Sequence, residues 1–481
     1  MYISKMVLEN FRSFRGKQTL YFKKGMNFFV GNNNCGKTTI FKAIEFLQSA
    51  KNKNEFITLG KENENVSVEV ILSGDDIKEI VEQQDKKRYQ SHVYEANGTY
   101  NIRLLRSSEV TKIIQNNREK TLDIKNVRTW NSETNQFENP SGVDSVIKVL
   151  FDAQFVYSDM KNEEYQDFGK TKIVGKLVNA ITKDFQNSKL FLELKKAHEK
   201  AFGDSGLKTA FNETEESIQS IMREQYGDAK VEFDFKLPDM DNFLKQGSIL
   251  LTENGITTDV SEKGTGMQRA LAMSLIQVYS NIVNEDNSKQ LLFFIDEPET
   301  FLHPKAQQKV IKAFKNISEE TQVFITTHSP YLLKEFNNKN HDIKIFTNHS
   351  DNKVIESHEI NNFPYSPTWG EINYFAFEMV NIELLNELYG HLQEKSGNFR
   401  QKQFDQFLES KGINKNVKYK RQNKNGHVYE IDHTLPTYVR NIIHHPENTL
   451  NKSFTDKQLK EAIDALIIVN NKMNDIHENF S

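Results

Sequence analysis

The segment Met26–Thr39 constrains the fold of this chain more than any other part of it. An apolar run leads into a loop that matches the pattern G-x-x-x-x-G-K-[ST], and a helix is expected to open at Thr38. Gly31 and Gly36 permit backbone angles at which successive N–H groups point at phosphate oxygens. Lys37 is suited to the β- and γ-phosphates, and the Thr38 hydroxyl is suited to Mg²⁺. This strand, loop and helix therefore predict a site for a nucleoside triphosphate.

The helix after the loop is expected to add its N-terminal dipole to the phosphate site. Ile40, Ile44 and Leu47 recur at the spacing of one helix face, which would pack on a sheet. The alternative is a glycine turn that happens to precede a lysine, and the flanking strand and helix disfavour it. We expect ATP and Mg²⁺ as ligands. The residues predicted to contact the nucleotide are Gly31, Asn32, Asn33, Asn34, Cys35, Gly36, Lys37, Thr38 and Thr39.

Composition limits the classes of protein to which this chain can belong. Its 481 residues suffice for two or three domains, and no run of about 18 apolar residues indicates a membrane span. The first residues lack the apolar segment of a signal peptide, and one cysteine excludes an intrachain disulfide framework. A cytoplasmic protein is the expectation. Because the net charge is −4, any contact with nucleic acid has to come from a local basic patch.

Two carboxylates follow a second apolar run. Leu291–Ile295 is apolar throughout, as expected of a strand buried on both faces of a parallel sheet, and Asp296 and Glu297 come directly after it. Ligands bind at the carboxyl ends of such strands. Asp296 is suited to the Mg²⁺ shell, and Glu297 could polarise an attacking water. Acidic residues are common at strand ends, so the phosphate loop elsewhere in the chain is what favours the functional interpretation.

A third buried strand is predicted at Val323–Thr327 and ends at His328. A lone histidine at such a place is usually structural. Here the strand should lie beside the strand that ends at Asp296, which would bring His328 near the γ-phosphate as a polarising contact. Lys37, Glu297 and His328 are therefore the predicted catalytic residues.

The N-terminal segments indicate a β-rich lobe beside the nucleotide site. Ile3–Leu8 and Thr19–Phe22 predict an antiparallel pair of strands with a turn at Gly16. Residues 50–150 alternate over several short stretches and predict the rest of the lobe. Arg12, between the paired strands, is either a contact to bound phosphate or a solvated turn residue.

The middle of the chain indicates a strand, a helical insertion and a second small-residue loop. Val149–Tyr157 predicts an apolar strand that carries Gln154, and residues 173–226 show helical periodicity. No heptad pattern persists, so a long coiled coil is not expected. The small-residue loop Glu262–Arg269 opens a helix whose expected apolar face is Leu271, Leu275 and Val278.

The order of these motifs resembles the ABC-type ATPase heads of the SMC, RecF and OLD (overcoming lysogenization defect) class. Asp296-Glu297-Pro298-Glu299 followed by Leu302-His303-Pro304 is most similar to the OLD branch. The resemblance covers residues 1 to about 350. It implies an α/β fold in which a mixed sheet carries the phosphate loop. It also implies a β-rich lobe and a helical insertion at about residues 160–240, within an ATPase domain at residues 1–360.

Carried over by position, the resemblance implies Walker A at Gly31–Thr38, Walker B at Asp296, a catalytic base at Glu297 and a switch histidine at His328. Gln154 becomes the candidate Q-loop residue and a candidate metal ligand beside Thr38 and Asp296.

A signature loop is implied at Gly264–Gln268, where the chain has Lys-Gly-Thr-Gly-Met-Gln in place of the Ser-Gly-Gly-Gln of transporters. In such heads the signature loop of one subunit caps the nucleotide held by the phosphate loop of another. ATP would therefore join a homodimer or higher homo-oligomer, and hydrolysis would release it. The residues implied to contact the nucleotide from this loop are Gly264, Thr265, Gly266 and Gln268.

Residues 371–481 predict a mostly α-helical C-terminal domain that follows a boundary rich in Asn, Ser and Pro. The apolar residues from Ile372 to Leu392 predict one amphipathic helix. Thr455 and Gln458 predict a capping box at the start of the last helix. Residues 395–424 are locally basic and could hold nucleic acid, although a solvated face is the commoner arrangement.

Arg440 and His445 have the spacing of HEPN ribonucleases, in which arginine and histidine of two protomers converge on an RNA phosphate. That spacing is common by chance, and the alternative is a helix end before Pro446 with structural or partner contacts. The run Ile443–Asn448 behind such a head also resembles the ATPase subunit of Septu-type antiphage systems, which works with a separate HNH nuclease. Residues 371–481 contain no Asp-x-Asp pair for a TOPRIM nuclease.

The sequence therefore predicts a cytoplasmic ABC-type ATPase of prokaryotic antiviral defence, whose head dimerisation controls a nuclease on a partner protein. A HEPN ribonuclease in the C-terminal domain is the second hypothesis. A DNA repair or recombination clamp without a nuclease is the third. A transporter subunit fits least, because the segment before the signature loop lacks the pattern of that family.

Overall fold

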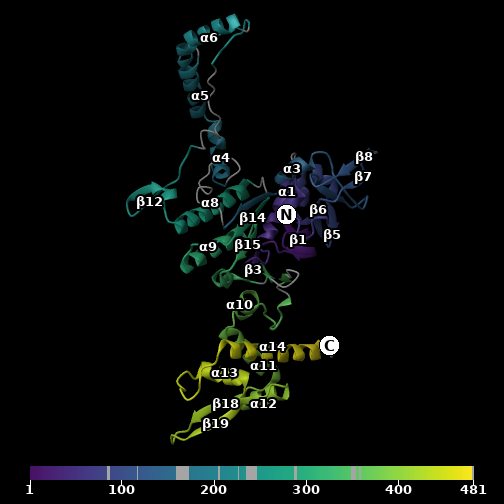
Figure 1. Cartoon of the computed structure of the whole chain (residues 1–481), viewed down its shortest axis with the longest axis vertical. Helices are drawn as coiled ribbons and strands as arrows, with labels where there is room; N and C mark the ends of the chain where they lie inside the picture. Colours follow the sequence, from purple (N-terminus) through teal and green to yellow (C-terminus); the bar gives the residue numbers. More distant parts are fainter. Residues whose placement is uncertain are drawn as a thin grey trace. The chain divides into compact units, whose positions relative to one another are not determined.

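The computed structural model of the chain (Figure 1) falls into two units by its internal contacts, and each is described by itself. The first comprises Met1–Val156, Gln290–Glu299 and Pro304–Ser481, and the second comprises Tyr157–Lys289 and Thr300–His303. The described residues are 1–83, 87–115, 118–158, 173–203, 206–225, 227–233, 246–286, 290–337, 339–347, 354–356 and 359–478.

A six-stranded sheet in the first unit carries the predicted motifs. In order across the sheet, its strands are β11 (Asp152–Val156), β14 (Leu291–Asp296), β15 (Gln322–Thr327), β3 (Met26–Gly31), β16 (Asp342–Phe346) and β17 (Val354–Glu356). The first five run parallel, and β17 is antiparallel to β16. Every residue of β3, β14 and β15 is buried, as expected of continuous apolar strands covered on both faces.

Helix α1 (Thr39–Ser49) packs on one face of this sheet. Phe41 meets the ring of Phe294 edge to face, with 5.3 Å between the ring centroids. Phe294 in turn stacks on Phe324 of the neighbouring strand, with centroids 4.6 Å apart. The apolar face predicted for this helix is buried as expected, at Ile40, Ile44 and Leu47.

The register of the parallel strands brings their carboxyl ends to one edge of the sheet. Asp296 pairs with Thr326, and Thr327 pairs with Val30, which directly precedes the phosphate loop. Strand β15 thus lies between the strand of Asp296 and the strand that leads into the loop. The prediction that the strand of His328 neighbours the strand of Asp296 is confirmed.

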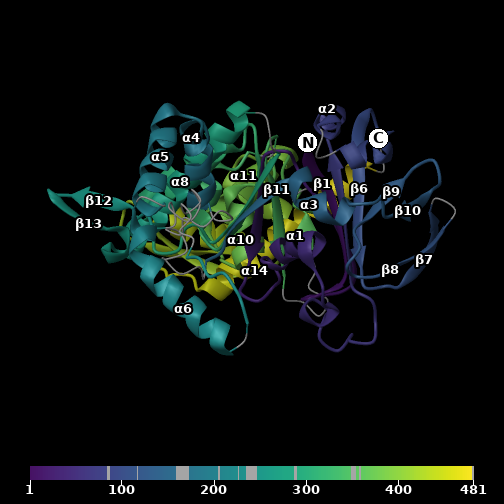
Figure 2. The ribbon, with the colours of Figure 1, turned by 90° about the horizontal axis from the view of Figure 1, so that it is seen from above.

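An antiparallel sheet forms the predicted β-rich lobe, and Figure 2 shows β1, β6, β9 and β10 gathered in it. Helices α2 (Ile77–Glu82) and α3 (Val143–Leu150) and a separate hairpin of β7 (Thr111–Gln115) and β8 (Arg118–Leu122) accompany it. Its strands in order are β10 (Gln136–Glu138), β9 (Arg128–Asn131), β6 (Thr99–Ser107), β4 (Ser67–Ser73), β1 (Tyr2–Phe11) and β2 (Phe14–Tyr21), with β5 (Tyr94–Ala96) paired to β6.

Two predicted boundaries in this region are wrong. The hairpin of β1 and β2 turns at Arg12 and Ser13, whereas Gly16 lies inside β2, where its N–H donates to Asn10 Oδ1 at 3.0 Å. A register shift near Phe11 lets Gly16, with a φ of +68°, occupy the strand. The strand predicted from Val149 begins only at Asp152, because the residues before it complete α3.

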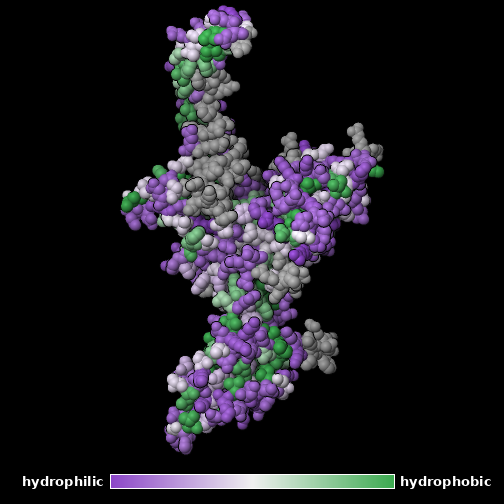
Figure 3. Space-filling view, viewed as in Figure 1, coloured by the Kyte–Doolittle hydropathy of each residue, from purple (hydrophilic) through white to green (hydrophobic). Residues whose placement is uncertain are grey.

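The second unit contains the predicted helical insertion. Helices α4 (Ile173–Gln186), α5 (Lys189–Phe202) and α6 (Asn212–Gln225) confirm the helical periodicity of residues 173–226. Residues 159–172 and 234–245, at the ends of the predicted insertion, lie outside the described residues. Helix α5 exposes leucines, which are visible as green surface in Figure 3.

A short hairpin of β12 (Leu250–Glu253) and β13 (Ile256–Asp259) precedes helix α8 (Thr265–Asp286) in the second unit. The predicted apolar face of α8 is wrong, because Val278 is 46% exposed. The helix instead turns another face inward, whose buried residues include Ala272, Met273, Ile276 and Tyr279.

The C-terminal region of the first unit is mainly helical, as predicted, and also contains a β-hairpin. Strand β18 (Lys415–Gln422) pairs antiparallel with β19 (Val428–Thr434). Helix α10 packs against β3 and β16 of the central sheet. Its helices among the described residues are α10 (Trp369–Phe377), α11 (Ile382–Ser396), α12 (Gln401–Ser410), α13 (Leu435–His444) and α14 (Asp456–Glu478).

The single helix predicted from Ile372 to Leu392 is wrong, because the chain breaks it into α10 and α11. Glu378 adopts a left-handed conformation with a φ of 53° and ends α10. Asn381 then caps α11, since its Oδ1 accepts the N–H of Leu384 at 2.8 Å. The helical spacing of apolar residues continues across the break, so the sequence pattern alone did not reveal that the helix ends there.

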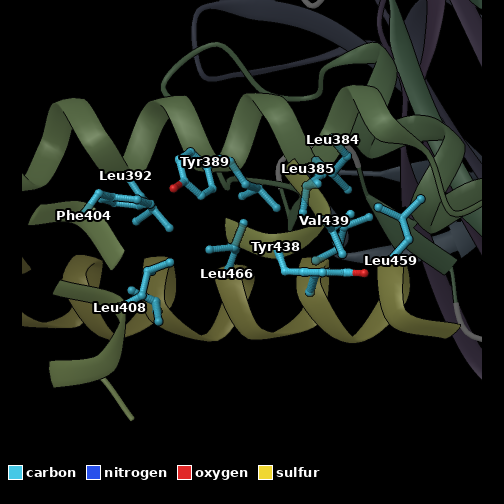
Figure 4. Close-up of a cluster of buried hydrophobic side chains, with 14 of the residues drawn as sticks. Leu384, Leu385, Tyr389, Leu392, Phe404, Leu408, Tyr438, Val439, Leu459 and Leu466 are labelled. Carbon is cyan, nitrogen blue, oxygen red and sulfur yellow. The ribbon is translucent and has the colours of Figure 1, made fainter. Parts of the chain in front are cut away.

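Helices α11, α13 and α14 share a hydrophobic core, shown in Figure 4. Leu385 and Leu392 of α11 face Leu459 and Leu466 of α14, and Val439 of α13 lies between the two helices. The predicted capping box at the start of α14 is confirmed by two reciprocal hydrogen bonds. Gln458 N–H donates to Thr455 Oγ1 at 3.2 Å, and Thr455 N–H donates to Gln458 Oε1 at 3.0 Å.

The predicted α/β class is confirmed, with its mixed sheet, β-rich lobe, helical insertion and helical C-terminal region. The contacts keep residues 371–481 in one unit with the central sheet and separate the insertion instead. The predicted domain limits 1–360 and 371–481 stay predictions. Among the described residues, none of the helices combines the length and apolar character that crossing a bilayer requires.

We expect Leu466→Ala to lower the free energy of unfolding by about 2–5 kcal/mol, because it leaves a cavity in the core of α11, α13 and α14. Ile468→Ala on the same helix is the matched control, since Ile468 is 54% exposed and should cost far less. Urea unfolding of the full chain measures both. Equal losses for the two variants would contradict this assignment of the core.

Candidate nucleotide and hydrolysis site

The phosphate loop is shaped by two glycines that no other residue could replace without displacement. Gly31 has a φ of 136°, and a Cβ atom there would lie 2.2 Å from the carbonyl oxygen of Phe346. Gly36 has a φ of 98°, and a Cβ atom there would lie 2.4 Å from Ser13 Oγ. Both positions therefore require glycine for conformation and for space, as the pattern predicted.

Lys37 lies inside this loop. Its ammonium donates to the carbonyl oxygens of Gly31 at 3.0 Å and Asn32 at 2.8 Å, and the residue is buried. Burial lowers the pKa of Lys37, and the nearby Cys35, Glu297 and Asp296 partly oppose that shift. A partly desolvated cation at this position is suited to bind phosphate oxygens, because little water has to be displaced from it.

Cys35 contributes to the loop through its backbone. Its thiol turns inward and donates to the carbonyl oxygen of Asn32 at 2.7 Å, and the side chain is buried. Burial raises the pKa of the Cys35 thiol. The predicted contact of Cys35 with a nucleotide would therefore come from its backbone N–H group.

The two predicted metal ligands on the loop and on β14 meet directly. Thr38 Oγ1 donates to Asp296 Oδ1 at 2.9 Å, although the two residues are 258 positions apart. Asp296 Oδ1 also accepts the hydroxyl of Thr326 at 2.6 Å, and Asp296 is buried. A hydroxyl and a carboxylate are hard oxygen ligands of the kind that Mg²⁺ prefers when phosphates complete its shell. These residues fit a Mg²⁺–nucleotide complex.

Glu297 and His328 are also brought together. Glu297 Oε1 lies 3.2 Å from His328 Nε2, and each side chain is about one third exposed. The backbone of Glu297 has a φ of 44°, which is a strained conformation for a residue with a side chain. Its N–H donates to the carbonyl and hydroxyl oxygens of Thr326, at 3.1 and 3.0 Å, which hold it there.

Sequence reasoning assigned no role to Glu299, which the structure places beside these residues. Its Oε1 accepts hydrogen bonds from the Thr327 hydroxyl at 2.8 Å, from His328 N–H at 2.7 Å and from Ser329 N–H at 3.1 Å. Burial raises the pKa of Glu299, and these hydrogen bonds oppose the shift. A second acid two residues after Glu297 was the only signal for it in the sequence.

Gln154 does not lie where a metal ligand is needed, which contradicts its predicted role. It pairs with Phe293, three residues before Asp296, or about 10 Å along the strand. Residues three positions apart on a strand point to opposite faces of the sheet, so Gln154 faces away from the side of Asp296. Its amide donates to Asp152 Oδ1 at 2.6 Å.

Arg12 stands at the tip of the hairpin of β1 and β2. The next residue, Ser13, hydrogen-bonds Thr39 Oγ1 with 3.0 Å between the oxygens, so the hairpin tip packs on the phosphate loop. Arg12 itself is exposed, and its N–H donates to the carbonyl oxygen of Phe56 at 2.7 Å. Contact of its side chain with a nucleotide stays a prediction.

The predicted signature loop opens α8 in the second unit. Gly264 and Thr265 are exposed. Gln268 is buried, and its amide donates to the carbonyl oxygens of Lys263 at 2.6 Å and Ser261 at 3.2 Å. A Cβ atom on Gly266 would lie 2.9 Å from the carbonyl oxygen of Phe301, which explains the glycine. Contact of this loop with a nucleotide stays a prediction. The side-chain amide of Gln268 already donates hydrogen bonds within the loop.

Arg440 and His445 of the predicted ribonuclease motif each have a partner within the C-terminal region. The guanidinium of Arg440 lies over the buried ring of Tyr389, 4.6 Å from its centroid. His445 ends α13, and its Nδ1 lies 3.1 Å from Glu447 Oε1. These contacts favour a structural role for Arg440, and the ribonuclease assignment stays a prediction.

Several basic residues of the segment 395–424 are paired with acids. Lys418 Nζ lies 3.0 Å from Glu430 and Lys420 Nζ lies 3.7 Å from it, across the hairpin of β18 and β19. Lys415 Nζ lies 3.0 Å from Glu409. This pairing favours the solvated face over a nucleic-acid patch.

Comparison with known proteins places this site within a family. The family model described as "AAA ATPase domain" matches residues 1–333. The Old nuclease of Escherichia phage P2 is 27% identical over 358 residues, which cover 69% of this chain and 57% of that protein. Endonuclease GajA of Bacillus cereus (strain VD045) is 24% identical over 381 residues, which cover 75% of this chain and 61% of that protein.

The chain thus spans about three fifths of the length of both relatives. Among solved structures, an SMC head bound to the C-winged helix domain of ScpA aligns over 74% of this chain and 98% of that chain, with 16% identity and a TM-score of 0.42. The family match includes Lys37, Asp296, Glu297 and His328. The chain therefore belongs to the family of proteins that carry this AAA ATPase domain.

Proposed function

We propose that this protein hydrolyses ATP while two copies of the chain clasp the nucleotide, and that hydrolysis releases them. The observation that carries the proposal is the meeting of four motif residues at one sheet edge. Thr38 and Asp296 are joined at 2.9 Å, and Glu297 and His328 lie 3.2 Å apart beside them. These residues follow or end three neighbouring strands, and they supply the metal ligands, the base and the polarising group on which phosphoryl transfer to water depends.

Each residue has a defined task in this mechanism. The loop N–H groups and Lys37 bind the β- and γ-phosphates. Thr38 and Asp296 would hold Mg²⁺, which supplies positive charge to the phosphate oxygens. Glu297 orients the attacking water and accepts its proton, and His328 contacts the γ-phosphate. The carboxylate of Glu297 meets His328, whereas that of Asp296 accepts the hydroxyls of Thr38 and Thr326, so the two acids have different partners and can act separately.

The second copy would close the site with its signature loop. The exposed Gly264 and Thr265 at the start of α8 offer N–H groups and a helix dipole to the γ-phosphate. Because this contact depends on the γ-phosphate, it would last only until hydrolysis. The dimer would therefore report the state of the nucleotide.

We further propose that this switch controls a nuclease on a partner protein in antiphage defence. Two relatives are named as nucleases, and the family match of this chain is to an ATPase domain. The resemblance of Ile443–Asn448 to ATPase subunits with a separate HNH nuclease supports a partner. A repair clamp is the second candidate, because the DNA replication and repair protein RecF of Francisella tularensis is 45% identical over 51 residues.

We expect Glu297→Gln to lower kcat for ATP hydrolysis by about 100-fold or more and to leave ATP binding intact, because the amide cannot accept a proton. The variant should also accumulate as a dimer with ATP, which light scattering detects as a doubled mass. Glu320→Gln is the matched control, since Glu320 is exposed just before β15. An unchanged kcat for Glu297→Gln would rule out Glu297 as the base.

A nuclease on a partner protein predicts that the purified chain leaves tRNA intact, with or without ATP. Arg440→Ala should then lose only stability, by about 0.5–2 kcal/mol, because it removes the contact with Tyr389. Arg421→Ala is the matched control, since Arg421 lies over Tyr419 in the same way. Cleavage by the wild type that both Arg440→Ala and His445→Ala abolish would instead establish the HEPN hypothesis.

The gene beside this one is expected to encode an HNH-type nuclease. The purified pair should nick plasmid DNA in one nucleotide state and be silent in the other, and gel electrophoresis with ATP, ADP and a non-hydrolysable analogue measures this. Nicking at the same rate under all three conditions would argue against control by the ATPase.

A further inference from the structure

Three successive groups at the end of β15 donate to a single carboxylate oxygen. Glu299 Oε1 accepts the Thr327 hydroxyl, the His328 N–H and the Ser329 N–H, at distances between 2.7 and 3.1 Å. The other oxygen, Oε2, is buried and has no hydrogen-bond partner among the residues that the structure describes. Burying an oxygen that has no hydrogen-bond partner costs desolvation free energy. We therefore attribute the carboxylate at this place to the hydrogen bonds that its other oxygen, Oε1, accepts.

The path of the chain after Asp296 makes this contact possible. Glu297 turns into the left-handed region, and Pro298 follows it. The two glutamates that flank Pro298 then reach the same neighbour from different sides. Glu297 meets the imidazole of His328, while Glu299 binds the backbone N–H of the same residue.

The segment held by Glu299 is also braced internally and by α9 (Pro304–Ile317). Ser329 N–H donates to Thr327 Oγ1 at 2.9 Å, and Ser329 Oγ donates to Gln307 Oε1 at 2.7 Å. Together with these bonds, the hydrogen bonds to Glu299 Oε1 fix the backbone on which His328 is carried. Glu299 Oε2 is buried, and Oε1 is already engaged by three donors, which suits this carboxylate to holding the segment.

We propose that Glu299 is a positioning residue, which holds Thr327–Ser329 so that His328 faces Glu297 and the γ-phosphate. The part of this proposal that concerns the γ-phosphate rests on the proposed ATPase function. In this proposal Glu299 acts through His328, by way of its hydrogen bonds to Thr327, His328 and Ser329. The geometry also predicts which substitutions are tolerated. A carbonyl oxygen at the place of Oε1 should be enough to accept the three hydrogen bonds.

The first test is steady-state ATP hydrolysis by the full chain. Glu299→Ala should lower kcat at least tenfold and leave KM for ATP within about twofold, because His328 loses its position and the phosphate loop does not. Glu299→Gln should keep at least half of the wild-type kcat and the same pH dependence of kcat. Its amide oxygen can accept the three hydrogen bonds, and its NH₂ would take the place of the unpartnered Oε2. Glu320→Ala is the exposed control.

The second test does not depend on hydrolysis. Hydrogen exchange of a peptide that spans Thr327–Tyr331 should be faster in Glu299→Ala than in the wild type and unchanged in Glu299→Gln. If Glu299→Ala does not fold, Thr327→Val removes one of the three donors. It should lower kcat about threefold or more and speed the same exchange.

Three results would overturn the proposal: wild-type kcat and exchange in Glu299→Ala, wild-type kcat and exchange in Thr327→Val, or a loss of kcat in Glu299→Gln as large as in Glu297→Gln. The last result would make Glu299 a participant in the chemistry. If the wild type hydrolyses no ATP, the proposed function fails and the exchange measurement alone decides. Faster exchange in Glu299→Ala would then support the positioning contact, and equal exchange would overturn it.

Discussion

The hydrogen bond between Thr38 and Asp296 joins the phosphate loop, which follows β3, to the end of β14. It exists because β15 lies between β3 and β14, so the ends of three parallel strands meet at one edge. Every other contact of the site follows from that order. Thr326 supports both Asp296 and Glu297 from the middle strand, and His328 continues that same strand toward Glu297.

The contrast between the strands and their ends explains where the polar chemistry is concentrated. All residues of β3, β14 and β15 are buried, and their aromatic rings stack across the sheet at Phe294 and Phe324. The polar side chains of the site, Asp296, Thr326 and Thr327, lie at the carboxyl ends of β14 and β15. In such surroundings hydrogen bonds and charges interact strongly, and an unpaired group is costly. This is why a single carboxylate, Glu299, can hold a whole turn of backbone.

The family model covers the part of the chain that holds the nucleotide site, and the C-terminal region lies outside that match. The family match ends at residue 333, and the core of α11, α13 and α14 lies after it. In that region Arg440 contacts Tyr389, and the lysines of β18 face Glu430. Both observations explain charged residues by internal contacts.

The sequence by itself determined the phosphate loop, the carboxylates at the end of β14, the histidine after β15 and the capping box at Thr455. Each of these is a local pattern, in which residues a few positions apart act together, so spacing along the chain is sufficient evidence. Only the tertiary structure decided where Gln154 and Glu299 lie relative to Asp296 and His328. The strand register turns Gln154 away from Asp296, and a left-handed turn returns Glu299 to β15. Likewise the buried face of α8 and the break after Glu378 depend on what packs there. The register of the strands, the face that a helix buries and the hydrogen-bond acceptors from distant residues all arise from pairing between distant segments. No local spacing in the sequence encodes that pairing.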